Sequence, residues 1–211
     1  LTWNGSQEKP FKTISMGVSM AVDGSTIVVA EGVYNETVYI TDSDINLLGA
    51  GSGKSDIKSG IYVKGHKVTI SGFSITGDYG IELTDSEAMI TSNEIYDCTY
   101  SGIGAFFSKS VLTITSNKIY GNYVGIGVES NSTATISSNE ISDNNYAGIA
   151  VSSNSSVTMT TNKIYNNNKD YSGYGIIIYV ASAIIKSNDI YNNSGSGICI
   201  TASSKATVTS N

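Results

Sequence analysis

Residues 90–126 read ITSNEIYDCTYSGIGAFFSKSVLTITSNKIYGNYVGI, and one short pattern occurs twice within this stretch. The pattern is a small polar residue, Asn, a charged residue and Ile, followed by Gly-Ile eight to thirteen residues after the Asn. The Asn recurs with spacings of 24, 22, 23, 26 and 23 residues, at Asn93, Asn117, Asn139, Asn162, Asn188 and Asn211. The Gly-Ile pairs begin at Gly102, Gly125, Gly148, Gly175 and Gly197. A period near 23 residues with two marks in each period indicates a repeat protein.

Each repeat contains short alternations of apolar and polar residues and no stretch with helical periodicity. These features are typical of one turn of a parallel β-solenoid, whose coils stack about 4.8 Å apart with side chains in register. Residues 26–30, 45–48 and 68–75 have the same character, so the coils are expected to begin well before Asn93. The sequence therefore predicts an all-β fold, a single-stranded parallel β-helix of roughly eight or nine coils over residues 26–211.

The two ends of the chain differ from the repeats. Residues 1–25 are predicted to form an extension and a short capping α-helix, because Ile14, Val18, Ala21 and Val22 have helical spacing. The helix is expected to cover the apolar end of the first coil. After Asn211 no covering segment follows, so this end is expected to be uncapped, either as a site of assembly or because the chain is part of a longer protein.

Positions counted from the repeated Asn separate into inward and outward columns. The Ile residues that precede and follow the Asn form two apolar columns, which we assign to the core. The Asn column itself is interpreted as a structural ladder, since buried amides can pair between coils and satisfy backbone groups at a turn.

One outward column alternates in charge from coil to coil, and a tyrosine column lies beside it. The sequence predicts a candidate interaction face made of these two columns, containing Glu94, Lys118, Glu140, Lys163, Asp189, Tyr96, Tyr120, Tyr165 and Tyr191. The charges are expected to fix the register of the coils, and the tyrosine rings could either pack on each other or offer faces to sugar rings or to another copy of the chain.

The stretch PFKTISMGVSMAVDGSTIVVAEGVYNETVYI at residues 10–40, with ISGFSI at 70–75 and the repeated coils, resembles the right-handed parallel β-helix proteins of the pectin-lyase-like superfamily. The resemblance covers almost the whole chain. It implies a right-handed coil of three sheets with an N-terminal capping helix, and an extracytoplasmic protein of a kind that often meets polysaccharide. Because this superfamily contains lyases, hydrolases, esterases, epimerases and inert surface rods, the resemblance specifies the fold and not the activity.

The composition excludes several kinds of site. The chain has twelve Lys, no Arg and one His, His66, which is interpreted as a turn residue. The lyase and hydrolase sites that the resemblance implies use Arg, so none of them can be assembled here, and we predict no catalytic residues, no metal and no cofactor. A surface calcium ion is left open. A net charge of −6 argues against a nucleic-acid partner, and no apolar run is long enough to enter a membrane.

The two cysteines, Cys98 and Cys199, are about four coils apart, which excludes a disulfide between them. They are therefore candidate thiols for a bond between two molecules, Cys199 in particular because its column faces outward. Five sequons are candidate glycosylation sites in an exported protein, at Asn4, Asn35, Asn131, Asn154 and Asn192.

Three functions remain open. The leading hypothesis is a non-enzymatic extracellular rod, a structural or interaction component of a cell envelope that assembles with copies of itself. The alternative is a domain that binds or degrades polysaccharide at a site not located in the sequence. A minor alternative is ice binding through rows of outward Thr and Ser, at Thr113, Thr115, Thr135, Ser137, Thr158, Thr160, Thr207 and Thr209.

Overall fold

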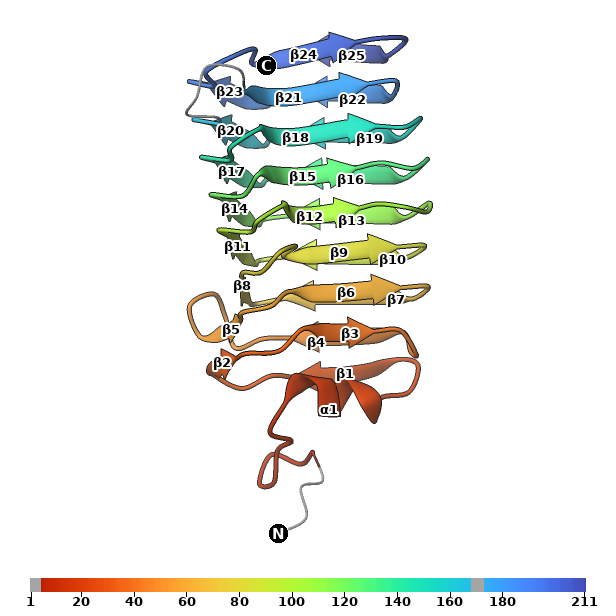
Figure 1. Ribbon diagram of the computed structural model, residues 1–211, viewed down its shortest axis with the longest axis vertical. Coiled ribbons are helices and arrows are strands. Elements are labelled where there is room, and N and C mark those ends of the chain that lie inside the picture. Colours follow the sequence, from red (N-terminus) through yellow and green to blue (C-terminus); the bar gives the residue numbers. More distant parts are fainter. Residues whose placement is uncertain (1–4, 168–172) are drawn as a thin grey trace.

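The computed structural model describes residues 5–167 and 173–211, and these form a rod of stacked coils (Figure 1). The described residues contain one short helix, α1 (Ile14–Ser19), at the N-terminal end of the rod, and 25 strands. The predicted fold class, an all-β parallel β-helix with a short N-terminal helix, is confirmed. In the described part of the chain, no helix has the length and hydropathy needed to cross a membrane.

Three parallel sheets run the length of the rod, and each full coil contributes one strand to each sheet, with one further strand at the C-terminal end of the first sheet. The first sheet contains β1 (Ser25–Val28), β4 (Ile45–Leu48), β7 (Lys67–Ser71), β10 (Glu87–Thr91), β13 (Val111–Thr115), β16 (Thr133–Ser137), β19 (Ser156–Thr160), β22 (Ser182–Lys186) and β25 (Lys205–Thr209). The second contains β2 (Gly32–Tyr34), β5 (Ser55–Ile57), β8 (Ser74–Ile75), β11 (Glu94–Tyr96), β14 (Lys118–Tyr120), β17 (Glu140–Ser142), β20 (Lys163–Tyr165) and β23 (Asp189–Tyr191). The third contains β3 (Val38–Ile40), β6 (Ile61–Lys64), β9 (Ile81–Thr84), β12 (Ser101–Ala105), β15 (Val124–Val128), β18 (Ala147–Ser152), β21 (Tyr174–Tyr179) and β24 (Ile198–Thr201).

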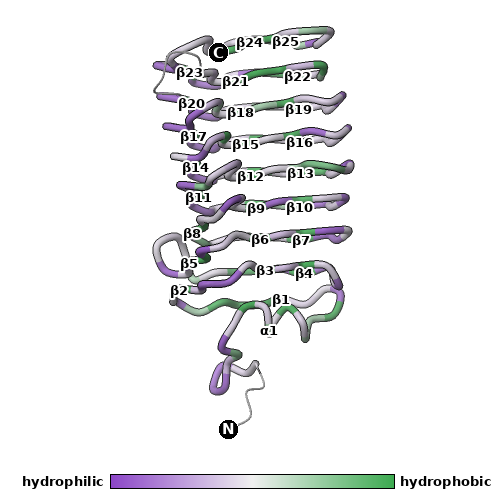
Figure 2. The backbone as a smooth tube through the Cα atoms, viewed as in Figure 1, coloured by the Kyte–Doolittle hydropathy of each residue, from purple (hydrophilic) through white to green (hydrophobic). Residues whose placement is uncertain are grey.

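The core consists of aliphatic columns that stack in register between coils. In the first sheet Ile90 pairs with Ile114 and Ile114 with Ile136, and all three are fully buried. The second and third sheets contribute equivalent Ile columns from the opposite walls. Each buried aliphatic side chain contributes about 1.5–3 kcal/mol. Figure 2 shows hydrophobic residues along the strands and hydrophilic residues at the turns near β11, β14, β17 and β20.

The repeated Asn residues lie at the corner between the first and second sheets, and all of them except the terminal Asn211 are buried. Asn117 shows the arrangement: its side-chain NH2 donates to the carbonyl oxygens of Ile90 and Thr115 at 2.9 and 3.0 Å, and to Oδ1 of Asn139 at 3.0 Å. The residue before each ladder Asn has a left-handed backbone, with φ near +57° at Ser116 and Ser138. The amide therefore satisfies backbone groups that this tight turn leaves without strand partners.

The other two corners contain ladders that the sequence analysis did not identify. A second amide ladder is formed by Asn122, Asn144, Asn167 and Asn193, each five residues after a member of the first, and a serine ladder by Ser86, Ser110, Ser132 and Ser155. Cys98 occupies the slot of the second amide ladder one coil earlier, where its N–H donates to Oδ1 of Asn122 at 3.0 Å. Each corner thus satisfies turn backbone groups with a short polar side chain, Asn at two corners and Ser at the third.

Helix α1 is anchored to the first coil by a carboxylate. Glu36 accepts the backbone N–H groups of Ile14 and Ser15 at 2.8 and 3.0 Å, and the Ser15 hydroxyl also donates to it. A negative group at the start of a helix satisfies free N–H groups and the positive end of the helix dipole. The helix ends at Ser19, and Val22, which the apolar spacing had included, is exposed.

Candidate functional site

The outer face of the third sheet carries two tyrosines and one carboxylate in register near its N-terminal end. Tyr39 of β3 pairs with Tyr62 of β6, which pairs in turn with Glu82 of β9. The residues on either side of each are buried, so strand alternation directs these three side chains outward.

The turn before β9 places two further groups beside them, Asp78 and Tyr79. Tyr79 stacks on Tyr100 of the next coil with ring centroids 5.1 Å apart, and the Tyr100 N–H donates to the Asp78 carbonyl oxygen at 2.8 Å. Gly60 allows the Tyr79 backbone to pass close to the coil before it. The φ of Gly60 is +76°, and a Cβ atom there would lie 2.1 Å from the carbonyl oxygen of Tyr79. Any other residue at position 60 would push the Tyr79 backbone away.

These side chains surround a pocket of about 250 Å³, which we call the aromatic cleft. It is lined by Thr37, Tyr39, Ser59, Ile61, Tyr62, Asp78, Tyr79, Glu82 and Tyr100. Tyr39 and Tyr100 are 59% and 50% exposed, so their rings are accessible from solvent. Tyr39 and Tyr62 meet edge to face at 64°, a geometry in which one ring keeps both faces free of its partner. Aromatic walls with a few convergent polar groups are typical of a ligand-binding site.

The charged groups of the cleft are acidic. Burial raises the pKa of Glu82 above its ordinary value, because the charged form of a carboxyl is disfavoured away from water. The pKa of the Tyr79 hydroxyl is also raised, first by burial and then by the negative charges of Glu82, Asp78 and Glu129 and by Tyr100. None of the described residues that line the cleft is basic.

Phe106, which follows β12, forms a wall beside Tyr79. Its ring centroid lies 5.7 Å from that of Tyr79, and the ring covers two glycines of the outward column, Gly104 and Gly127. A Cβ atom on Gly104 would lie 2.0 Å from the Phe106 ring. The glycines therefore leave room on the sheet for this aromatic side chain.

A row of tyrosines continues from the cleft along the rod. Tyr123 stacks on Tyr146 at 5.5 Å, and Tyr146 meets Tyr174 edge to face at 5.8 Å. Backbone hydrogen bonds join successive coils at these tyrosines: the Val124 N–H donates to the Tyr100 carbonyl oxygen at 2.9 Å, and the Tyr146 N–H donates to the Tyr123 carbonyl oxygen at 2.7 Å. This extension gives the cleft an elongated aromatic border suited to a linear ligand.

The interaction face predicted from the sequence lies elsewhere, on the outside of the second sheet. There the tyrosine rings stack on each other almost in parallel, Tyr96 on Tyr120 at 5.3 Å and 7°, and Tyr165 on Tyr191 at 5.1 Å and 3°. The charged column is in register, as strand pairing between Glu94, Lys118, Glu140, Lys163 and Asp189 shows.

The groups of that face are engaged with one another. Glu94 accepts from Lys118 at 3.3 Å, from the Tyr120 hydroxyl at 2.9 Å and from the Ser52 hydroxyl at 2.6 Å. Lys163 lies over the Tyr165 ring at 5.0 Å. Because neighbouring side chains cover many of these ring faces, the arrangement is suited to fixing the coils in register.

The cysteines and sequons differ in accessibility. Cys98 is 3% exposed, and burial raises its pKa to about 12, so the expectation that it serves as an intermolecular thiol is wrong. Cys199 is half-buried, and both cysteines are free thiols. Among the sequons, Asn35, Asn131, Asn154 and Asn192 are exposed, and Asn4 lies outside the described residues. The Thr and Ser rows of the first sheet are in register from β13 to β19 and are interrupted by Met89, Ile184 and Lys186.

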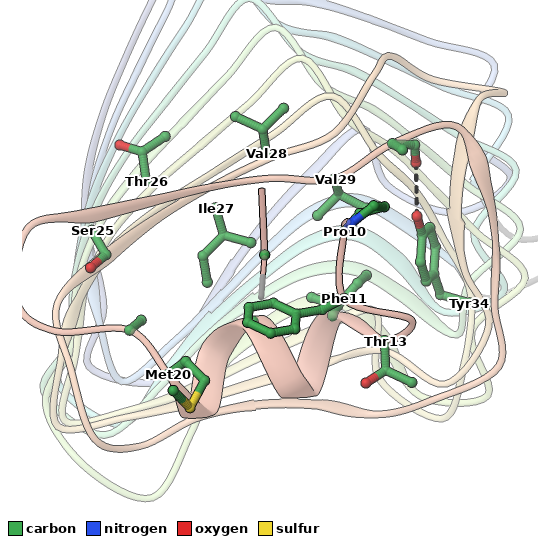
Figure 3. A pocket seen from close by; sticks show the side chains of 15 residues that line it. Pro10, Phe11, Thr13, Met20, Ser25, Thr26, Ile27, Val28, Val29 and Tyr34 are labelled. Carbon is green, nitrogen blue, oxygen red and sulfur yellow. Dashed lines mark hydrogen bonds between the residues drawn. The ribbon is translucent and has the colours of Figure 1, made fainter. Parts of the chain in front are cut away.

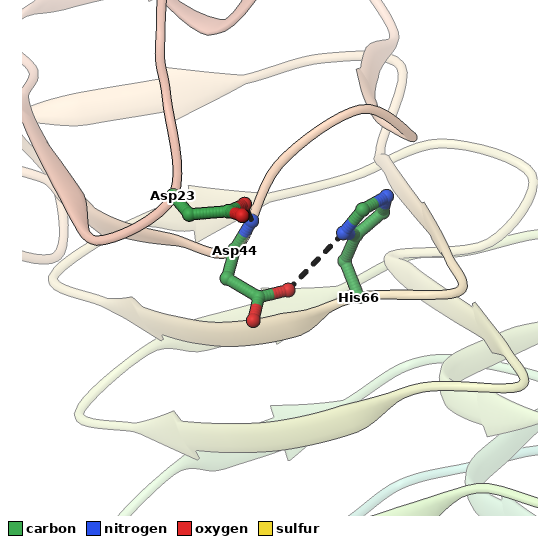
Figure 4. A group of neighbouring side chains, drawn as sticks. All are labelled: Asp23, Asp44 and His66. Atoms are coloured by element: carbon green, nitrogen blue, oxygen red, sulfur yellow. Dashed lines mark hydrogen bonds and ion pairs between the residues drawn. The ribbon is translucent and has the colours of Figure 1, made fainter.

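The sequence analysis did not predict one cluster of side chains of the kinds that bind metals, because its members are 21 and 22 residues apart in the sequence. Asp23, Asp44 and His66 offer ligand atoms within 4.8 Å of one another (Figure 4). His66 was expected to be an isolated turn residue, whereas its Nδ1 lies 3.1 Å from Oδ1 of Asp44. Both carboxylates also bind turn backbone: Asp23 accepts the Asp44 N–H and Asp44 the Lys67 N–H, each at 2.9 Å. These bonds give the cluster a complete structural role in holding successive turns together.

A larger cavity of about 520 Å³ lies between α1 and the first coil (Figure 3). Phe11, Met20, Ile27 and Val29 contribute to its lining, and the Tyr34 hydroxyl donates to the Ala30 carbonyl oxygen at 3.0 Å at its edge. No Asp, Glu, Lys or His is found among the described residues that line it. It lacks the carboxylates of the aromatic cleft and lies where the short helix covers the core incompletely.

Comparison with known proteins establishes the family. The model of the right handed beta helix region matches residues 59–211. The chain belongs to the right-handed β-helix family. The right-handed parallel β-helix that the resemblance to the pectin-lyase-like superfamily implied is thereby confirmed. A second model, described as a protein of unknown function (DUF1565), matches residues 2–54 of this β-helix protein. A search of curated proteins gives no match.

Solved structures share the fold at low sequence identity. An alginate lyase from Paenibacillus sp. is 17% identical, with 89% of this chain and 96% of that chain covered and a TM-score of 0.55. A pectin methylesterase in complex with a hexasaccharide is 14% identical, with coverage of 94% and 81% and a TM-score of 0.55. A tailspike protein of an Escherichia coli O157:H7 bacteriophage is 15% identical, with coverage of 90% and 39% and a TM-score of 0.52. At these identities the likeness establishes the β-helix architecture alone.

The tyrosine row could have been found in the sequence. Tyr100, Tyr123 and Tyr146 each stand two residues before the Gly of a Gly-Ile pair, a spacing as regular as that of the ladder Asn. The cleft itself has no such pattern, because Tyr39, Tyr62 and Glu82 come from early coils with different sequences.

Proposed function

We propose that this β-helix protein binds a polysaccharide in the aromatic cleft, on the outer face of strands β3, β6 and β9 near the N-terminal end of the third sheet. The observation that carries the proposal is the gathering of four accessible or half-buried tyrosines with Asp78 and Glu82 around one pocket. Flat aromatic faces pack against the C–H faces of sugar rings, and carboxylates accept hydrogen bonds from sugar hydroxyls.

Fold neighbours give this reading further support. They include an alginate lyase and a pectin methylesterase bound to a hexasaccharide, so the same scaffold serves proteins that handle polysaccharide. This support favours the polysaccharide alternative over the non-enzymatic rod that the missing Arg residues had suggested. A polysaccharide ligand also agrees with the expectation that the protein is exported. Assembly with copies of itself and glycosylation stay predictions.

The test compares two tyrosines of similar exposure. Tyr100→Ala removes a ring of the cleft, and Tyr179→Ala removes a ring that is 55% exposed outside it. Binding to a panel of soluble glycans is measured by affinity electrophoresis and isothermal titration calorimetry. Loss of an aromatic contact at an interface commonly exceeds 1 kcal/mol, so Tyr100→Ala should weaken binding about fivefold or more. Equal effects of the two variants, or no glycan binding by the unaltered protein, would refute the proposal.

A second candidate function, cleavage of the bound polysaccharide, is favoured by Glu82. Burial raises the pKa of Glu82, so this carboxyl takes up a proton more readily than a free one as the pH falls. Such a group suits a general acid that protonates the departing sugar oxygen while water attacks the sugar carbon and the glycosidic bond breaks. Asp78 supplies a second carboxylate in the same cleft. Incubation of each bound glycan with the protein should release new reducing ends, and Glu82→Gln should abolish the release while binding persists. Unchanged glycan length after prolonged incubation would exclude this activity.

A further inference from the structure

We infer that the aromatic cleft selects glycans whose sugar units carry no negative charge. The inference rests on the proposed function, because it specifies the class of ligand for the same site. It follows from the charges that surround the cleft.

The ionisable groups at the cleft that can carry charge at neutral pH are carboxyls. Asp78 and Glu82 line it, and Glu129 is near enough for its charge to act on Tyr79, which also lines the cleft. A sugar carboxylate held against the tyrosines would therefore meet like charges, from the exposed Asp78 and from the half-buried Glu82, where screening by water is weaker. Sugar hydroxyls meet no such repulsion and can donate hydrogen bonds to the same carboxylates.

Basic groups that could offset this repulsion lie elsewhere. The chain has no Arg, and therefore no guanidinium group that could bind a carboxylate through two parallel hydrogen bonds. Lys64 shares strand β6 with Tyr62 but lies two residues further on and is not part of the lining. Other lysines pair with acids outside the cleft, Lys58 with Asp56 at 3.3 Å and Lys67 with Glu87 at 2.7 Å.

The second sheet provides an internal contrast. There Lys118 and Lys163 lie 4.6 and 5.0 Å from tyrosine ring centroids, so the chain does place cations against aromatic rings. At the cleft the groups beside the rings are carboxyls instead. The second-sheet face thus has cations beside its tyrosines and the cleft has carboxyls. This difference in charge favours an uncharged or amino-sugar ligand at the cleft.

The experiment uses glycan pairs that share a backbone and differ in charge. The full chain is titrated with alginate and carboxyl-reduced alginate, with polygalacturonate and its methyl ester, and with the hexasaccharides of chitin and chitosan, in chelator and then in calcium. Of the alginate and polygalacturonate pairs, each one that binds should favour its uncharged member at least tenfold over the carboxylate form. The chitin and chitosan hexasaccharides, which carry no carboxylate, should meet no such penalty. The double variant Asp78→Asn, Glu82→Gln should reduce the ratio of the affinity for the uncharged form to the affinity for the carboxylate form. Circular dichroism checks that this variant is folded.

Two outcomes separate this inference from the proposed function. If a carboxylate polymer binds as tightly as its uncharged partner, with or without calcium, and Tyr100→Ala weakens that binding, the site stands and the charge selection is wrong. If no glycan binds, or binding is indifferent to Tyr100→Ala, the proposed function fails and this inference falls with it. Preference for the uncharged forms that Tyr100→Ala removes and Tyr179→Ala leaves intact supports both.

Discussion

Replacement of Asn139 by Ala tests the amide ladder at the middle of the rod. The Asn139 side chain takes part in five hydrogen bonds between 2.9 and 3.0 Å, three of them to backbone groups of Asn117, Ile114 and Ser137. The Ala variant leaves these backbone groups at a buried corner without that partner. At about 1 kcal/mol net for each bond to backbone, and more where a buried group stays unsatisfied, we expect a loss of about 3–5 kcal/mol in the free energy of unfolding.

The assay is urea unfolding followed by circular dichroism, with the midpoint and the slope compared between variants. Asn145→Ala is the matched control, because Asn145 is exposed in a nearby turn of the same coil, and its loss should change stability by less than about 0.5 kcal/mol. A loss below about 1 kcal/mol for Asn139→Ala would show that the ladder amides contribute little to stability. That result would refute the assignment of the ladder as the device that satisfies this corner.

Three further outcomes are expected. A thiol reagent at pH 8 should modify Cys199 in the native protein and reach Cys98 only after unfolding, because burial raises the Cys98 pKa to about 12; rapid modification of both would contradict its burial. Hydrogen bonds from a serine, a tyrosine and a lysine lower the pKa of Glu94, so its stabilising effect is present above the unfolded-state pKa and is lost as pH falls through the folded one. Glu94→Gln should therefore cost about 0.5–1 kcal/mol at pH 7, and thermal melts should show the difference vanishing in strong acid rather than persisting. Gly104→Val should displace Phe106 from the sheet and cost about 1–3 kcal/mol, with a changed near-ultraviolet spectrum; an unaltered spectrum would show that the ring does not rest there.

Much of the fold could be predicted because each coil repeats the same local solution. The regular spacing of Asn93, Asn117 and Asn139 gave the period, and the flanking Ile residues gave the inward face. Stacking in register then makes one coil a template for the next, so a local error in one repeat is corrected by its neighbours. The second amide ladder was not predicted, although its members stand at a fixed offset of five residues from members of the first.

The candidate site could be predicted only in part. A tyrosine column was correctly expected on an outer face, but the sequence analysis selected the column of Tyr96 and Tyr120, where stacked rings and charges engage each other. The cleft depends on Tyr39 and Tyr62 from coils that lack the repeat, and on a turn whose path is set by Gly60. No single spacing in the sequence joins these residues.

The sequence by itself determined the coil, its period, its buried columns and the absence of any Arg-based site, because these depend on composition and on short-range alternation repeated many times. The tertiary structure alone decided which tyrosines share a pocket with carboxylates and which cover each other. Pocket formation depends on how turns of unequal length place side chains from separate coils, and that geometry is settled only when the coils stack.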